Sequence, residues 1–201
     1  MSSKTQAPPA PPRERIIAAA ADLFLKHGIR GVGVEAIAEA ADTNKMTLYR
    51  HFPSKDELIA EWARGIVAQK EAEWDDIAAK HPDDPAAQLI EWSKRVANKL
   101  AEMEKRGSML ANALAELPDA DHPARRVIQA HKTRERKRVQ KLCAEAGFQD
   151  PDFAANLFYL LLEGAFACVQ CTGMKRIGDD LVRLVDIMVE NSKDPASRLK
   201  R

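Results

Sequence analysis

The stretch from Val34 to Phe52 constrains the fold of this chain most, because it holds two short helical patterns with almost nothing between them. Its first half repeats apolar residues every three or four positions, on one face of a helix of about two turns: Val34, Ile37, Ala38 and Ala41. Asp42 and Thr43 then interrupt the pattern. An interruption this short leaves room only for a tight bend between two helices.

Asn44 opens the second helical pattern. Its side-chain oxygen can accept a hydrogen bond from a backbone N–H two or three residues later, so Asn44 is a good N-cap for a helix over residues 45–51. Leu48 and Phe52, four residues apart, form the expected buried face. The expected exposed arc carries donors for phosphate oxygens and base edges: Lys45, Thr47, Tyr49, Arg50 and His51. This pattern indicates a helix-turn-helix that inserts its second helix into the major groove, although short helix pairs also occur in all-α proteins that bind no DNA.

A third helix is expected directly after this pair. Ser54 and Glu57 form a capping box, and Lys55 lies in the first turn, where a cation opposes the helix dipole unless a phosphate lies nearby. The segment from Arg13 to Leu58 resembles the DNA-binding domain of TetR-family transcriptional regulators. The resemblance covers about a quarter of the chain and rests on Ile37-Ala38, Thr47-Leu48-Tyr49, Phe52 and Lys55-Asp56-Glu57-Leu58.

Two positions depart from the family pattern. The family generally has Gly followed by an apolar residue in the turn, whereas this chain has Asp42 and Thr43. Asp tolerates a left-handed backbone at modest cost, so we still expect the bend. Gly33 stands where the family has Ser or Thr, so it offers a phosphate only its backbone N–H.

The resemblance implies eight DNA-binding residues: Gly33, Asn44, Lys45, Thr47, Tyr49, Arg50, His51 and Lys55. Lys45 and Thr47 are expected to reach base edges, and Tyr49, His51 and Lys55 to hold phosphates. The implied function is a repressor that binds a pseudo-palindromic double-stranded DNA operator as a homodimer. A small hydrophobic ligand in a second domain would change the spacing of the two DNA-binding heads and release the operator.

Helical periods and prolines predict an all-α chain, with an N-terminal three-helix helix-turn-helix domain and a larger helical ligand-binding and dimerisation domain. The expected parts are a disordered proline-rich arm over 1–12, the DNA-binding domain over 13–60, the second domain over 61–193 and a flexible tail over 194–201. The helix that starts near Ser54 continues to about Ala79 and is expected to transmit movement. No apolar signal segment is visible, so a cytoplasmic protein without a membrane span is expected.

The segments 153–169 and 181–189 are apolar nearly all round. A helix without a polar face must be covered on both sides, and one copy of the chain has too few other helices to do so. We therefore expect a two-fold dimer whose four helices form a bundle. The predicted interface residues are Leu157, Leu161, Gly164, Cys168, Leu181, Leu184, Val185 and Met188.

Several further features have more than one interpretation. The resemblance implies a ligand cavity, for which the candidates are residues that could equally form an ordinary core: Trp92, Met103, Met109, Leu114, Phe158 and Phe166. Residues 124–146 carry eight Lys and Arg against two Glu, a net charge of +6, which indicates a solvated face, an anionic ligand or an added DNA contact. Cys168 and Cys171 lie one helical turn apart and could share a metal or form a redox pair, but packing is the expectation and no metal is predicted.

The net charge and the motifs in the sequence limit which other functions are possible. The net charge is +1, and residues 1–60 hold eight Lys and Arg against seven Asp and Glu, so a positive DNA-binding surface must come from placement. No metalloprotease, serine hydrolase or P-loop motif occurs, so neither an enzyme nor a cofactor is predicted. The alternative hypothesis is a helical dimer that binds a small molecule or a protein and no DNA.

Overall fold

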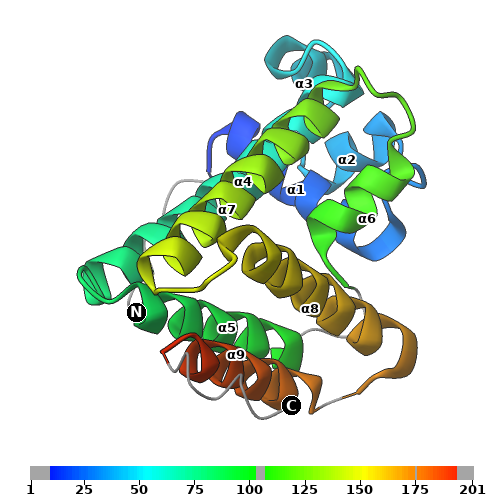
Figure 1. Cartoon of the computed structure of the whole chain (residues 1–201). Helices are drawn as coiled ribbons and strands as arrows, with labels where there is room; N and C mark the ends of the chain where they lie inside the picture. Colours follow the sequence, from blue (N-terminus) through cyan, green and yellow to red (C-terminus); the bar gives the residue numbers. More distant parts are fainter. Residues whose placement is uncertain (1–9, 103–106, 175, 194–201) are drawn as a thin grey trace, which may run out of the picture. The chain divides into compact units, whose positions relative to one another are not determined.

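The structure is a computed structural model that describes residues 10–102, 107–174 and 176–193. Within these ranges it contains nine α-helices and no β-strand (Figure 1), which confirms the all-α prediction. The helices are α1 (Pro12–His27), α2 (Val34–Ala40), α3 (Lys45–His51), α4 (Lys55–Lys80), α5 (Pro85–Glu102), α6 (Met109–Glu116), α7 (Pro123–Glu145), α8 (Pro151–Thr172) and α9 (Ile177–Lys193).

The described chain divides into two compact units. Unit 1 comprises residues 10–65 and 113–127, and unit 2 comprises the remaining described residues. The predicted boundary after residue 60 stays a prediction, but residues 113–127, expected in the second domain, group with the amino-terminal segment. The reason is polar contact: the Glu116 carboxylate accepts a hydrogen bond of 2.8 Å from the Arg30 backbone N–H, and His122 Nε2 lies 3.2 Å from Asp56 Oδ1.

Helices α1, α2 and α3 contact one another and bury the apolar faces expected from their spacing. Ile16, Ile37 and Leu48, one from each helix, have no exposed surface at all. The Phe24 ring meets Trp62 edge-on, with centroids 5.5 Å apart, which ties α1 to the start of α4. Burial of this shared core fixes how each of the three helices is rotated about its own axis.

The bend between α2 and α3 forms as predicted. Asp42 has φ 49°, in the left-handed region, and the Thr43 N–H donates to the Ala38 carbonyl at 3.0 Å. The Asp42 carboxylate lies 3.3 Å from the Arg15 guanidinium, away from α3. Asn44 caps α3 as expected, because its Oδ1 accepts from the Thr47 N–H at 2.9 Å.

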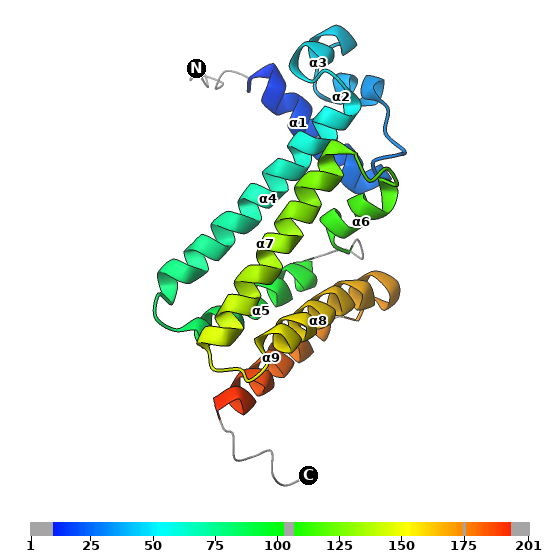
Figure 2. The same cartoon turned by 45° about the horizontal axis from the view of Figure 1, so that its top comes forward.

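Unit 2 is built around α5, α8 and α9, which lie side by side (Figures 1 and 2). Their shared core includes Trp92 and Phe158, and the Trp74 indole of α4 stacks on Trp92 with centroids 5.2 Å apart. Leu181 and Val185 of α9 belong to this core, with 5% and 0% of their surface exposed. Their prediction as dimer-interface residues is therefore wrong, because both side chains are already covered within one chain.

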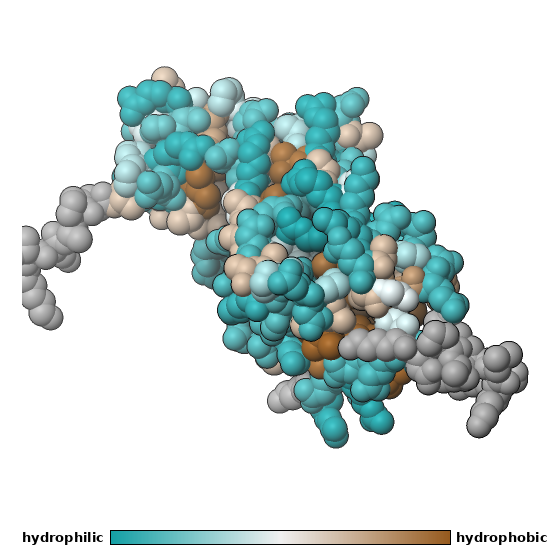
Figure 3. All heavy atoms as spheres, turned by 60° about the vertical axis from the view of Figure 1, so that its left-hand side comes forward, coloured by the Kyte–Doolittle hydropathy of each residue, from teal (hydrophilic) through white to brown (hydrophobic). Residues whose placement is uncertain are grey.

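Helix α8, of 22 residues, is long and apolar enough to cross a membrane by composition. Core helices have the same composition, and one side of α8 packs into unit 2. Its buried residues are Ala154, Ala155, Phe158, Leu162, Ala165 and Val169. The face of the molecule drawn in Figure 3 is mostly hydrophilic, with smaller apolar patches between polar side chains.

Leu48 and Met46 give a matched test of the α3 packing. Leu48→Ala should lower the free energy of unfolding by about 2–5 kcal/mol, because it leaves a cavity in the shared core. Met46→Ala should change it by no more than about 0.5 kcal/mol, because Met46 is 81% exposed. Urea denaturation followed by circular dichroism measures both. Equal losses in the two variants would mean that α3 is rotated differently from the structure described here.

Candidate functional site

The outward face of α3 is the first candidate site. Lys45, Met46, Tyr49 and Arg50 are exposed, whereas Thr47 and His51 are half-buried. Of the five donors predicted on the outward arc, three are therefore exposed and two are half-buried. The sequence analysis did not single out Met46, although an 81% exposed Met next to Lys45 is unusual for a helix with an apolar core face.

Lys45 is held in place by an acidic neighbour from α2. Its ammonium donates to Glu35 Oε1 at 2.6 Å and lies 5.9 Å from the centre of the Tyr49 ring. The hydrogen bond to Lys45 lowers the pKa of the Glu35 carboxyl, and the same bond raises the pKa of Lys45. Both groups thus stay charged over a wide pH range. A phosphate or base edge that binds Lys45 has to compete with Glu35.

Lys55 and the residues that cap α2, α3 and α4 make structural contacts within unit 1. The Lys55 ammonium donates to the Ile29 carbonyl at 2.7 Å, and its burial lowers its pKa. This bond uses one of three donors, so the others stay available to an anion. Gly33 is the N-cap of α2 without a side-chain hydrogen bond, and Asn44 uses its side-chain oxygen to cap α3. Ser54 Oγ accepts from the Glu57 N–H at 3.1 Å, which supplies one half of the predicted capping box.

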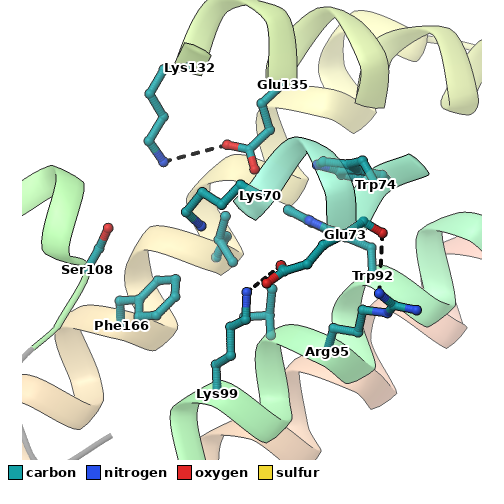
Figure 4. Close-up of a pocket in the computed structure, with 12 residues that line it drawn as sticks. Lys70, Glu73, Trp74, Trp92, Arg95, Lys99, Ser108, Lys132, Glu135 and Phe166 are labelled. Atoms are coloured by element: carbon teal, nitrogen blue, oxygen red, sulfur yellow. Dashed lines mark hydrogen bonds and ion pairs between the residues drawn. The ribbon is translucent and has the colours of Figure 1, made fainter. Parts of the chain in front are cut away.

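The second candidate site is a pocket within unit 2, with a volume of about 20 Å³. This is enough for about one water molecule. Its lining is Lys70, Glu73, Trp74, Trp92, Arg95, Val96, Lys99, Ser108, Lys132, Glu135, Leu162 and Phe166. The walls therefore combine aromatic and aliphatic surface with four cations and two carboxylates (Figure 4).

Two of the six predicted ligand residues, Trp92 and Phe166, line this pocket. Phe158 is 1% exposed and lies in the core of unit 2. Met109 is 42% exposed and Leu114 is half-buried in unit 1, so neither lines the pocket. Met103 lies outside the described residues. The prediction favoured large apolar residues, which are as suitable for a core as for a cavity.

The charged residues of the pocket were missed, although the sequence held a signal. Lys70 lies four residues after Ile66 and four before Trp74, so it occupies a position in the apolar stripe of α4. Glu135 likewise lies within a stripe of α7 that includes Ile128 and Val139. Charged residues on the buried side of a helix usually have a partner or a ligand.

Basic α7 is neutralised largely by acids from α4 and α8. Lys132 lies 2.7 Å from Glu163, and Arg138 lies 3.3 Å from Glu71. Buried His131 shares the same Glu71, with Nδ1 3.1 Å from its carboxylate. These pairs place the charge of α7 in a network that spans three helices of unit 2. They leave little of it free for an added DNA contact.

The outward sides of α8 and α9 carry large apolar groups. Leu160 is 72% exposed, and Leu184 and Ile187 are each 43% exposed. Gly164 is exposed and has no atom within 4 Å of the place where a Cβ would lie. Of the other predicted interface residues, Leu157, Leu161, Cys168 and Met188 are half-buried, and Leu161 and Met188 pack against the core. The surface left for a second copy is thus narrower than predicted.

The cysteines occupy three different environments. Cys171 is exposed, Cys168 is half-buried and Cys143 is buried. In the described part of the chain, no group of three or more His, Cys, Asp or Glu residues is arranged to hold a metal ion. Burial raises the pKa of the Cys143 thiol to about 12.

Residues 16–62 match the family model of bacterial regulatory proteins of the tetR family. The HTH-type transcriptional repressor SCO4008 of Streptomyces coelicolor is 28% identical over 169 residues, 84% of each chain. The HTH-type transcriptional repressor KstR of Rhodococcus jostii is 29% identical over 102 residues, 51% of this chain and 45% of that protein. The crystal structure of SCO4454, a TetR-family transcriptional regulator from Streptomyces coelicolor, superposes with a TM-score of 0.84 at 26% identity, covering 91% of this chain and 96% of that one.

Thiol reactivity tests the burial of Cys143. In the double variant C168S/C171S, Cys143 is the one remaining thiol, since the chain has three cysteines. With its pKa raised to about 12, this thiol stays protonated at pH 8, so Ellman's reagent should modify it only after denaturation in guanidinium. Rapid colour development in the folded protein would show that Cys143 is accessible.

Proposed function

Because the chain belongs to the TetR family of bacterial regulatory proteins, we propose that it is a transcriptional repressor that binds operator DNA through α3. The observation that carries the proposal is the outward face of α3, where Lys45, Tyr49 and Arg50 stand exposed on a helix whose opposite side is fully buried. A helix of this kind can enter the major groove without losing its own packing. Its named relatives are repressors and regulators.

The side chains of α3 have chemistry for both parts of DNA recognition. Lys45 can give up its hydrogen bond to Glu35 and donate to the edge of a guanine instead. Thr47 is the second side chain that would contact base edges. Tyr49 and His51 are suited to phosphates, as is the part of the Lys55 ammonium that Ile29 does not use. Met46 adds an apolar contact for a thymine methyl group. The competing Glu35 disfavours nonspecific phosphate binding at Lys45, which would help the protein to discriminate between sequences.

We propose a homodimer as the DNA-binding form. The support is the apolar surface of α8 and α9, to which Leu160, Leu184 and Ile187 contribute in one chain. A two-fold dimer would present two copies of α3 to half-sites about 34–36 Å apart, one helical turn of DNA, or somewhat farther. A pseudo-palindromic operator follows from that symmetry. Because bacterial operators lie in the cytoplasm, this function places the protein there.

We propose that a ligand in the pocket of unit 2 releases the DNA. Helices α4, α6 and α7 each begin in one unit and end in the other, so all three connect the ligand-binding unit to the DNA-binding unit through the chain itself. The ligand acts only if it binds the released conformation more tightly than the DNA-bound one. The cavity of about 20 Å³ has to widen before any organic ligand can enter. A ligand would therefore bind a conformation with a wider cavity more tightly than the one described.

Selection from random duplex DNA should recover a pseudo-palindromic consensus. On that consensus, Tyr49→Ala and Lys45→Ala should each weaken binding by about 1–3 kcal/mol, since each removes a contact of α3. The control is Lys94→Ala, an exposed lysine of unit 2, which should bind as the unchanged protein does. Gel-shift titrations at fixed salt measure all three. Equal affinity of the two α3 variants and the unchanged protein would place the DNA elsewhere.

The oligomeric state tests the dimer. Light scattering should give about twice the chain mass of 22.3 kDa. Leu160→Glu should raise the dimer dissociation constant at least tenfold, because an unpaired carboxylate in an apolar interface costs several kcal/mol. Met109→Glu, which also replaces an exposed apolar residue, should leave association unchanged. A dimer that tolerates Leu160→Glu would rule out the outward face of α8 as the interface.

A further inference from the structure

Lys70 differs from the other cations of the pocket in making no ion pair with any acid in the described part of the chain. Lys132 pairs with Glu163 at 2.7 Å, Lys99 pairs with Glu73, and the Arg95 guanidinium pairs with Asp76. Among the described residues, no carboxylate oxygen lies within 4.0 Å of the Lys70 ammonium.

The neighbours of Lys70 make this ammonium costly to keep charged. Desolvation by burial is the main cause that lowers the pKa of Lys70, and Glu135 opposes it. The charges of Lys99 and Lys132 lower this pKa further, and Glu73 raises it. Both acids are already engaged, since Glu73 binds Lys99 and Glu135 accepts from the Tyr159 hydroxyl at 3.1 Å. Lys70 is half-buried, and a partly desolvated ammonium gains from a charge-assisted hydrogen bond, so an anion brought next to Lys70 would be favoured.

The uncharged side chains that line the same pocket indicate which chemical group is attached to the anion. Trp74 and Trp92 stack with an interplanar angle of 21°, and Phe166 lies across the space from them. Figure 4 shows Lys70 directed from α4 into the space bounded by Phe166 and Lys99. Flat aromatic walls favour a planar apolar group, because ring contacts add to the area that is removed from water. A bare inorganic anion would make no use of these aromatic side chains.

We propose that the effector is an aromatic monocarboxylate, whose carboxylate pairs with Lys70 and whose ring packs against Trp92 and Phe166. This rests on the proposed function, because it names the ligand class of the same pocket. The sequence predicted only a small hydrophobic ligand, and this proposal adds a carboxylate and an aromatic ring. The ring replaces contacts among Trp92, Leu162 and Phe166, so binding widens the pocket, and the paired ammonium offsets part of that cost.

Calorimetric titration of the full chain tests the class directly. The probes are benzoate, phenylacetate and indole-3-carboxylate, each beside its neutral amide of the same shape. At least one acid should bind, and its amide should bind at least tenfold more weakly. Equal binding of acid and amide, or no binding of any acid, overturns the proposal. Sodium phosphate is titrated as well, and phosphate binding as tight as that of the best acid removes the aromatic part of the proposal.

Variants at Lys70 assign the charge. Lys70→Met keeps the length of the side chain and should lower the affinity for the best acid at least tenfold, whereas Lys70→Arg should retain most of it. Lys94→Met, on the exposed face of α5, is the matched control and should bind as the unchanged protein does. Unchanged affinity in Lys70→Met contradicts the assignment. Melting temperatures show that each variant folds.

Operator binding is measured separately, so that the two proposals can fail independently. Lys70→Met should still bind the selected DNA, and the best acid should release the unchanged protein but not this variant. If the acid binds through Lys70 and no DNA is retained by any form, the repressor assignment fails while the ligand class stands. If DNA is retained and no acid binds, the ligand class fails.

Discussion

Burial of Leu48 in the core shared by α1, α2 and α3 is the constraint on which the rest of unit 1 depends. With this side chain fully covered, the rotation of α3 is fixed, and Lys45, Tyr49 and Arg50 have to face outward. The bend before α3 also helps to fix the orientation of this helix. Asp42 adopts a left-handed backbone conformation, and Asn44, two residues later, caps α3. The outward face of α3, which is the proposed DNA-binding surface, is thus a consequence of apolar packing and turn chemistry. No excess of positive charge in unit 1 is needed to produce it.

In unit 2, ion pairs hold α7 against α4 and α8. The charges of α7 meet Glu71 from α4 and Glu163 from α8, so that a strongly basic helix is held against its neighbours. Tyr159 donates to the Lys132 carbonyl and to Glu135, and burial together with the nearby carboxylate raises its pKa above the ordinary range. This network satisfies nearly every charge around the pocket. Among the described residues Lys70 makes no ion pair, and this is the basis for the proposal that the pocket binds an anion.

The two units divide two tasks that place opposite demands on packing. Unit 1 has to present the same face of α3 at all times, and its core of large apolar side chains is suited to that. In the proposed function, unit 2 has to change when a ligand binds, and it combines stacked indoles with ion pairs whose partners can be exchanged. The proposed dimer would use the apolar residues on the outward sides of α8 and α9.

The sequence by itself determined the helices and the local geometry of α2 and α3. Periodicity, Asn44 as N-cap and the boundary at Pro85 are local properties, and the observed helices follow them closely. Only the tertiary structure decided which apolar residues of α9 are covered within one chain, because the stripe of α9 is the same whether it meets α5 or a second copy. The position of Lys70 in the apolar stripe of α4 is visible in the sequence, but only the fold shows whether it has an acidic partner, since that depends on where Lys99, Lys132 and their acids lie. Pairing between side chains far apart in sequence leaves no periodic trace, and for that reason the ion pairs around the pocket had to come from the fold.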